Sequence, residues 1–265
     1  MLIIKLICSA AIGYLSWDKG QLWLAPFLTL IWSQAKNKSE AYLIALLYYL
    51  SASYGLIKGA GVFFGEAGKS SLVSGVALWL LPNLFLALPW GLLWNTKGYL
   101  WRIPFILLTI SLPPPGLFGW CNPITAAGMI FPAGGWSGLG AAMVLMIALA
   151  YRNKFRHIFI LLGIISIGLN TFYKEADLPS EVVAINTKLG WLENFQDEYL
   201  HNKFLIEKVA EVISQQNQIK LILLPELIIG NWNDANRHLW QGIHTKAKRL
   251  GVTILLGGRI DLSSQ

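Results

Sequence analysis

The sequence has 265 residues, of which 55% are hydrophobic and 13% are charged. An ordinary soluble domain carries about 25% charged residues, so this composition excludes that class and predicts a membrane protein. The net charge of +7 lies in residues 1–170, which hold 11 Lys and Arg against 3 Asp and Glu, whereas residues 171–265 hold 10 against 11. These basic residues lie singly or in small groups between apolar runs, which indicates membrane topology and no direct binding to nucleic acid.

Residues 1–170 are predicted to form a multispan α-helical membrane domain of about seven helices. Several of its apolar runs are shorter than the roughly 20 residues that cross a bilayer core. The predicted number of spans is therefore accurate to about one. The seven runs are Leu2–Trp17, Gln21–Trp32, Ala41–Ile57, Leu72–Trp94, Tyr99–Leu112, Gly138–Tyr151 and His157–Leu169.

The distribution of basic residues predicts the orientation of this domain, because cytoplasmic loops carry the surplus of Lys and Arg. With a cytoplasmic N-terminus, the inside loops hold Lys36, Lys38, Lys97, Arg152, Lys154 and Arg156, and the outside loops hold Lys19, Lys58 and Lys69. An odd number of spans then places the chain after Asn170 on the opposite face. We therefore expect a multi-pass protein of the bacterial inner membrane with its soluble part in the periplasm.

Residues 1–170 contain few side chains that could take part in ion transport or catalysis. No paired carboxylates or histidines fall within the predicted spans, which argues against an ion-coupled transporter. Glu66 lies in a predicted outside loop, where a lone carboxylate is usually solvated. The uncharged, proline-rich segment 111–140 cannot be one continuous helix; it forms either an apolar surface that meets a lipid acyl chain or a packing loop. Cys8 and Cys121 make a disulfide framework improbable.

Residues 171–265 have an ordinary soluble composition and a regular alternation of elements. The expected order is strand, helix, strand, helix, strand, which predicts a parallel α/β sheet with right-handed crossovers. Asp234 can cap the second helix, and Gly251 can end it. The expected elements are Glu181–Asn186, Asn194–Gln216, Lys220–Leu224, Asp234 to about Leu250, and Val252–Leu256.

Glu226 is the candidate catalytic residue. It follows Pro225 at the end of the second strand, and the carboxyl ends of parallel strands are where α/β sheets place ligand-facing groups. Apolar neighbours would raise the pKa of this carboxyl toward neutrality, as a general base requires. The alternative is a strand-end ion pair with a basic side chain, and spacing alone leaves both open.

The motifs VVAIN, LLPE, KRLGV and LLGG occur in this order with helices between them. This order resembles the start of a carbon–nitrogen hydrolase (nitrilase superfamily) domain. Because a multispan anchor precedes it, the chain looks like the apolipoprotein N-acyltransferase branch. Within that branch, the segment GLFGWCNPITAAGMIFPAGGWSGLG is most similar to the TraB family of conjugal-transfer proteins. The resemblance implies that residues 171–265 are the first part of a nitrilase-like αββα sandwich.

The resemblance also implies a Glu–Lys–Cys triad for acyl transfer, without metal or cofactor. Glu226 matches the glutamate of the triad, and Trp191 resembles a tryptophan near the active site, although it can equally be a packing residue. Neither the lysine nor the cysteine can be assigned, because residues 171–265 contain no cysteine. We therefore expect a fragment, a split gene or an incomplete sequence, and an uncovered apolar sheet face.

Two functions remain open, and the sequence does not decide whether the chain is an enzyme. In the first, the parent protein transfers an acyl group from membrane lipids to an unknown acceptor. In the second, the chain is a non-catalytic envelope or scaffold component that binds other envelope or conjugation proteins and assists conjugative DNA transfer.

Overall fold

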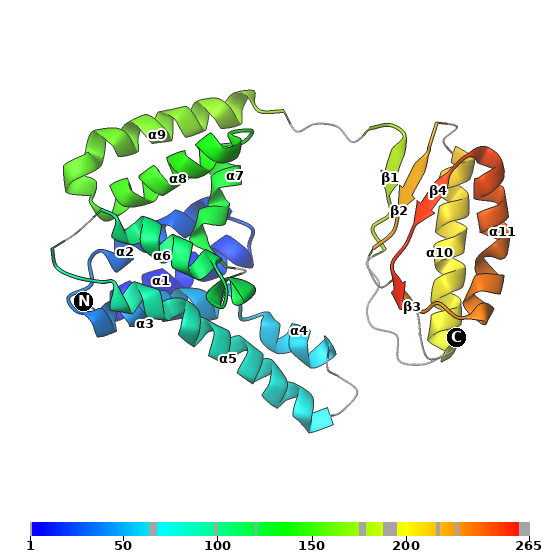
Figure 1. Ribbon diagram of the computed structural model, residues 1–265, viewed down its shortest axis with the longest axis horizontal. Coiled ribbons are helices and arrows are strands. Elements are labelled where there is room, and N and C mark those ends of the chain that lie inside the picture. Colours follow the sequence, from blue (N-terminus) through cyan, green and yellow to red (C-terminus); the bar gives the residue numbers. More distant parts are fainter. Residues whose placement is uncertain are drawn as a thin grey trace. The chain divides into compact units, whose positions relative to one another are not determined.

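The computed structural model describes residues 2–63, 68–97, 100–119, 121–174, 179–187, 195–215, 218–225 and 228–259 (Figure 1). The chain divides into two compact units, Met1–Lys174 and Glu175–Gln265, which we call unit 1 and unit 2. Each unit has its own hydrophobic core.

Unit 1 is built from helices, some of them single 3₁₀ turns (η). They are α1 (Leu2–Trp17), η1 (Leu22–Phe27), α2 (Leu28–Trp32), α3 (Lys38–Ala52), α4 (Leu56–Phe63), α5 (Gly68–Leu92), α6 (Arg102–Ser111), η2 (Pro115–Phe118), η3 (Pro123–Ala126), α7 (Ala127–Ile130), α8 (Gly135–Ala150) and α9 (Arg152–Phe172). Tryptophan N–H groups are satisfied inside the core: Trp32 donates to the carbonyl of Trp90 at 2.9 Å, and Trp90 donates to the Tyr49 hydroxyl at 3.1 Å.

Helices α1 and α3 are joined by a buried ion pair. The Nζ atom of Lys5 lies 2.7 Å from Oε1 of Glu40, and the two side chains are only 7% and 8% exposed. Lys5 also donates to the carbonyl of Gln34, and Glu40 accepts the backbone N–H of Lys36 at 2.9 Å. Both charges therefore have hydrogen-bond partners beyond each other, as buried charges require.

The prediction of seven membrane spans is wrong. Within the described residues, two helices are long and apolar enough to cross a bilayer, Leu72–Leu92 in α5 and Asn153–Phe172 in α9. The run Gln21–Trp32 contains Pro26 and divides into η1 and α2. Helix α6 has 10 residues, which gives about 15 Å of helix against a hydrocarbon core of about 30 Å. Apolar composition alone did not reveal where these helices end.

The segment 111–140 is a chain of short helices rather than one long helix, as its prolines predict. Asn122 accepts the backbone N–H of Ile124 at 3.2 Å and so begins η3. Ala126, Ile130 and Phe131 are buried in the core of unit 1, whereas Trp136 is exposed. The burial of these residues supports a packing role for the segment.

The described part of unit 2 contains two small parallel sheets and two helices. The elements are β1 (Val182–Ala184), α10 (Phe195–Gln215), β2 (Leu221–Leu223), β3 (Ile229–Asn231), α11 (Asp234–Leu250), β4 (Thr253–Leu255) and β5 (Gly258–Arg259). The larger sheet has the order β1-β2-β4, and both of its pairs are parallel, as the sequence predicts. The smaller sheet pairs β3 with β5.

Helices α10 and α11 lie together on one side of the larger sheet (Figure 1). Side chains at alternate strand positions, such as Ile222 and Ile254, pack with Leu205, Val209 and Ile243 of the helices to form the core of unit 2. Successive strand residues point to opposite faces, so Leu221, Leu223 and Leu255 belong to the other face.

The prediction of a nitrilase-like αββα sandwich is also wrong. The described part of unit 2 has one layer of helices and one three-stranded sheet, while β3 and β5 form a separate two-stranded sheet. The motif order fitted a parallel βαβαβ arrangement, which many α/β folds share. A second sheet layer was inferred from the family resemblance alone.

Candidate functional site

A cavity lies between α11 and β4, two elements that a tight turn joins. The side chain of Asn233 accepts the backbone N–H of Asn236 at 2.9 Å and caps the start of α11, rather than Asp234 as predicted. Gly251 ends the helix in the left-handed region at φ 69°, where the absence of a Cβ removes the steric cost. The chain then enters β4 alongside the helix that it has just left.

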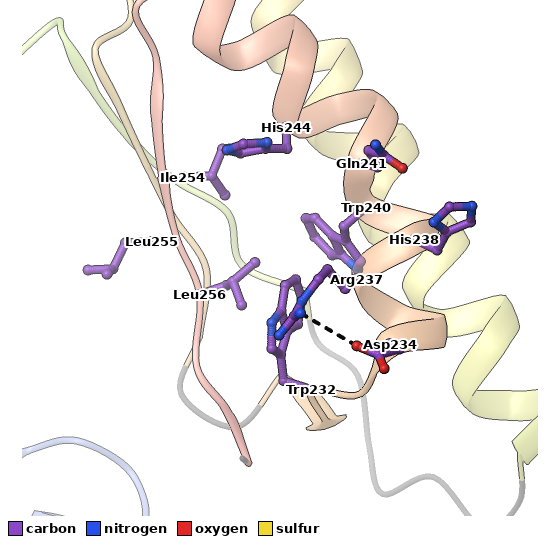
Figure 2. Close-up of a pocket in the computed structure, with 10 residues that line it drawn as sticks. All are labelled: Trp232, Asp234, Arg237, His238, Trp240, Gln241, His244, Ile254, Leu255 and Leu256. Carbon is purple, nitrogen blue, oxygen red and sulfur yellow. Dashed lines mark ion pairs between the residues drawn. The ribbon is translucent and has the colours of Figure 1, made fainter. Parts of the chain in front are cut away.

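The cavity has a volume of about 810 Å³, within the range of small-molecule and peptide pockets. Its apolar floor is made by two tryptophans and by residues of β4 and the segment that follows it, and its rim by polar residues of α11 (Figure 2). The lining residues are Trp232, Asp234, Arg237, His238, Trp240, Gln241, His244, Ile254, Leu255 and Leu256.

Trp240 anchors the floor through a polar network with α10. Its indole N–H donates to Oδ1 of Asn202 at 2.8 Å, and the amide of Asn202 donates to the carbonyl of Glu198 at 2.9 Å. Trp240 and Asn202 are both buried. The ring of Trp232 lies 6.5 Å from that of Trp240, centre to centre, at 57°. Because its hydrogen bond fixes the Trp240 ring, this part of the floor is held in one orientation.

The rim of the cavity is polar, with one acidic and one basic side chain beside two histidines and a glutamine. Arg237 lies 3.5 Å from Asp234, and both side chains are largely exposed, so this pair contributes little to stability and can exchange partners. His238, Gln241 and His244 are exposed on the same helix. An apolar floor beneath hydrogen-bond donors suits the binding of an amphipathic ligand.

Over the residues that the structure describes, no group of three His, Cys, Asp or Glu side chains could hold a metal ion.

His201 forms a second polar feature of unit 2. It is buried, and its Nε2 atom lies 2.9 Å from the carbonyl oxygen of Ile228. Among the described residues, Nδ1 of His201 has no hydrogen-bond partner. The contact between His201 and the Ile228 carbonyl joins α10 to the chain just before β3.

The residues predicted as catalytic and substrate-binding, Glu226 and Trp191, lie outside the described residues, so their roles stay predictions.

Cys121 is buried in unit 1, and burial raises the pKa of its thiol to about 12. A thiol with that pKa is protonated at neutral pH and is a poor nucleophile.

The cavity itself was not predicted from the sequence. Trp232 and Trp240 are eight positions apart and form no recognised motif. The available signal was Gly251, which predicted the end of the helix, followed by a strand at Val252–Leu256.

The described part of unit 2 is thus a small parallel α/β unit with a cavity, and most of the chain is similar to two conjugal transfer proteins. The probable conjugal transfer protein TraB of Sinorhizobium fredii (strain NBRC 101917 / NGR234) is 27% identical over 245 residues, covering 88% of this chain and 60% of the relative. The conjugal transfer protein TraB of Agrobacterium fabrum (strain C58 / ATCC 33970) is 26% identical over 270 aligned positions, covering 96% of this chain and 62% of the relative.

A third similarity is shorter. An "uncharacterized protein outside the virF region" of Agrobacterium tumefaciens (strain 15955) is 30% identical over 84 residues, covering 31% of this chain and 53% of that protein. No family model matches the chain. The chain spans about three-fifths of the length of the two conjugal transfer proteins, and it is similar to them over most of its own length.

Proposed function

We propose that this chain acts in conjugative DNA transfer as a membrane-associated component that works by binding other proteins of the transfer apparatus. The observation that carries this proposal is the similarity to two conjugal transfer proteins over 88% and 96% of the chain. A binding role also suits the cavity of unit 2, whose floor is apolar and whose rim carries hydrogen-bond donors. Acyl transfer has no support from the described geometry and is not part of the proposal.

The direct test is the transfer frequency of the conjugative element after an in-frame deletion of this gene. We expect transfer to fall strongly in the deletion and to return when the wild-type gene is supplied in trans. Replication and copy number of the element are measured in parallel, because a loss of the element itself would also lower transfer. Normal transfer from the deletion strain would refute the role in conjugation.

The proposal includes association of unit 1 with the bacterial inner membrane through α5 and α9. Side chains of the candidate span in α9 are not buried within unit 1, and such a long apolar surface is costly in water. Arg152, Lys154 and Arg156 lie at the N-terminal end of α9. By the positive-inside rule, this end would lie at the cytoplasmic face, and the chain would leave α9 on the periplasmic side.

Placing charges on α9 is expected to weaken membrane association. Ile164 and Ile167 are exposed apolar residues within the candidate span, and each lysine in the centre of a span costs about 2.5–3.5 kcal/mol. We therefore expect a high-pH wash to release a larger share of the double variant Ile164→Lys/Ile167→Lys than of the wild type, with α5 left as the remaining anchor. Leu200→Lys, at an exposed position on α10, is the matched control and should remain membrane-bound. Equal retention of the two variants would contradict insertion of α9.

A further inference from the structure

A groove lies between two packed helices of unit 1. Helices α3 and α5 pack against each other (Figure 1), and the groove is at the N-terminal end of α3 and the C-terminal end of α5. Its volume is about 390 Å³. The helices approach closely at Gly91, where a Cβ atom would lie only 2.8 Å from Cβ of Tyr42. The remaining lining residues are the apolar Leu43, Leu88 and Leu92 and the polar Lys38 and Ser39.

The apolar side of the groove continues along α5. Leu81, Phe85, Leu88 and Leu92 are spaced by four, three and four residues, which places them along one side of the helix. These side chains are 40–65% exposed. We call these four residues the α5 row, and it extends over about 17 Å of helix. A linear apolar chain that enters the groove can therefore continue along the α5 row.

The groove lies at one end of a candidate membrane span. The span Leu72–Leu92 has 21 residues, or about 31 Å of helix, which matches a hydrocarbon core of about 30 Å. With α5 inserted as proposed above, Leu92 lies where the hydrocarbon meets the headgroups. The α5 row then lies among acyl chains, and Lys38 lies at the level of the lipid phosphates.

Within the described residues of unit 1, no carboxylate is placed to neutralise Lys38. The carboxylates there belong to Asp18 and Glu40. Glu40 is buried and accepts hydrogen bonds from Nζ of Lys5 and from the backbone N–H of Lys36. Hydrogen bonds along α1 and α3 show that the two helices run parallel, so Asp18, which follows α1, lies far from the start of α3. The groove therefore keeps a net positive charge.

The end of unit 1 that holds the groove carries further basic residues. Lys36 precedes α3 and Lys97 follows α5, and both are exposed. Gln34 accepts a hydrogen bond from Lys5 and lines a second pocket together with Lys154 of α9, so the N-terminal end of α9 lies at this same end. The orientation proposed above for α9 places this end at the cytoplasmic face. Basic pockets between spans on that side bind the headgroups of anionic lipids.

We propose that the groove between α3 and α5 binds an anionic phospholipid of the cytoplasmic leaflet. One acyl chain lies in the groove and along the α5 row, while the phosphate pairs with Lys38 and accepts a hydrogen bond from the Ser39 hydroxyl. The inference rests on the proposed insertion of α5 and involves no acyl transfer. A second copy of this chain is disfavoured, because a twofold pairing of two grooves would bring two Lys38 side chains together.

The charge of the site is tested by native mass spectrometry of the full chain in detergent, with equal amounts of dioleoyl phosphatidylglycerol and dioleoyl phosphatidylethanolamine added. We expect the anionic lipid to bind preferentially. Lys38→Gln should weaken its binding about fivefold and leave binding of the zwitterionic lipid unchanged. Lys58→Gln makes the same charge change at an exposed position on α4 and should bind like the wild type. Equal binding of the anionic lipid by the two variants would overturn the proposal.

The acyl chain is tested with the same full chain and shorter ligands. Dihexanoyl phosphatidylglycerol buries fewer methylene groups in the groove and should bind about tenfold or more weaker than the dioleoyl lipid. Inorganic phosphate should not displace the dioleoyl lipid. Equal affinity for both lipids, or displacement by phosphate, would identify a site for free phosphate and overturn the lipid site. A lipid-free dimer that Lys38→Gln dissociates would make a second copy the occupant.

Failure of the lipid site is distinguished from failure of the proposed function by the membrane fraction. A wild-type chain that withstands the high-pH wash but shows no preference for phosphatidylglycerol would refute the lipid site alone. A wild-type chain that is absent from the membrane fraction would refute both the insertion of α5 and the lipid site. Neither result alters the expected loss of DNA transfer in the deletion.

Discussion

Replacing Lys5 by methionine should lower the free energy of unfolding of unit 1 by about 3–5 kcal/mol, because it leaves the buried carboxylate of Glu40 without its cation. The double variant Lys5→Met/Glu40→Leu removes both charges and should recover most of that loss. Thermal unfolding of the full chain in mild detergent, followed by circular dichroism, measures both effects. Similar losses in the single and double variants would mean that packing of the Lys5 side chain, and not the ion pair, stabilises the contact between α1 and α3.

The same pair makes a prediction about pH. The ammonium of Lys5 and the backbone N–H of Lys36 hold the pKa of Glu40 below its ordinary value of 4.5, and they outweigh the opposing effect of burial. A carboxyl with a lowered pKa in the folded state contributes stability that is complete above its ordinary pKa and is lost as the pH falls further. The wild-type chain should therefore lose stability below about pH 4.5 more steeply than the double variant does.

Replacing Trp240 by alanine is the second change with a large expected effect. Trp240 is buried and is part of the core of unit 2, and truncation of such a residue costs about 3–5 kcal/mol. The change also leaves Oδ1 of Asn202 without its donor. We expect faster hydrogen exchange of the backbone amides in both α10 and α11 of the full chain, measured by mass spectrometry.

Two variants control this result. Trp240→Phe keeps a ring but removes the indole N–H, so it should cost about 1–3 kcal/mol. His238→Ala, on the exposed side of the same helix, should leave the exchange rates unchanged. Unchanged protection of α10 in Trp240→Ala would contradict the view that this tryptophan fixes the two helices together.

The sequence predicted the local structure of unit 2 well because its elements have strong local signals. Predicted strands and helices match β1, α10, β2, α11 and β4 to within a few residues, since short apolar runs, a polar cap and Gly251 mark their limits. Strands β3 and β5 were missed because neither lies in an apolar run: β3 has the sequence IGN and β5 the sequence GR. The cavity was missed because it depends on tertiary packing of α11 against β4.

Unit 1 was predicted less well for a physical reason. Apolar runs show that residues avoid water, but they do not distinguish burial in a bilayer from burial in a helical core. Ile44, Ile106 and Met146 are buried inside unit 1, and they came from runs that were predicted as spans. In α9, by contrast, apolar residues such as Ile164 and Ile167 are exposed, which is why α9 remains a candidate span.

The prediction of Glu226 as a catalytic residue combined a local sequence signal with the family resemblance. Glu226 was singled out by its place after the strand Lys220–Leu224, and β2 lies within that stretch. The role of Glu226 as a base came from the resemblance, and its position is outside the described residues. The proposal of a binding role makes a clear prediction about this residue, because a binding component needs no general base.

The central claim is tested most directly by the frequency of DNA transfer. This frequency is measured for the conjugative element that carries the Glu226→Gln variant, beside the deletion and the wild type. The amount of each chain in the membrane fraction is measured in the same cells. We predict that the deletion loses transfer and that Glu226→Gln, which keeps the size of the side chain, transfers at the wild-type frequency. Loss of transfer in Glu226→Gln at a normal amount of protein would contradict a non-catalytic role, and normal transfer in the deletion would contradict any role in conjugation.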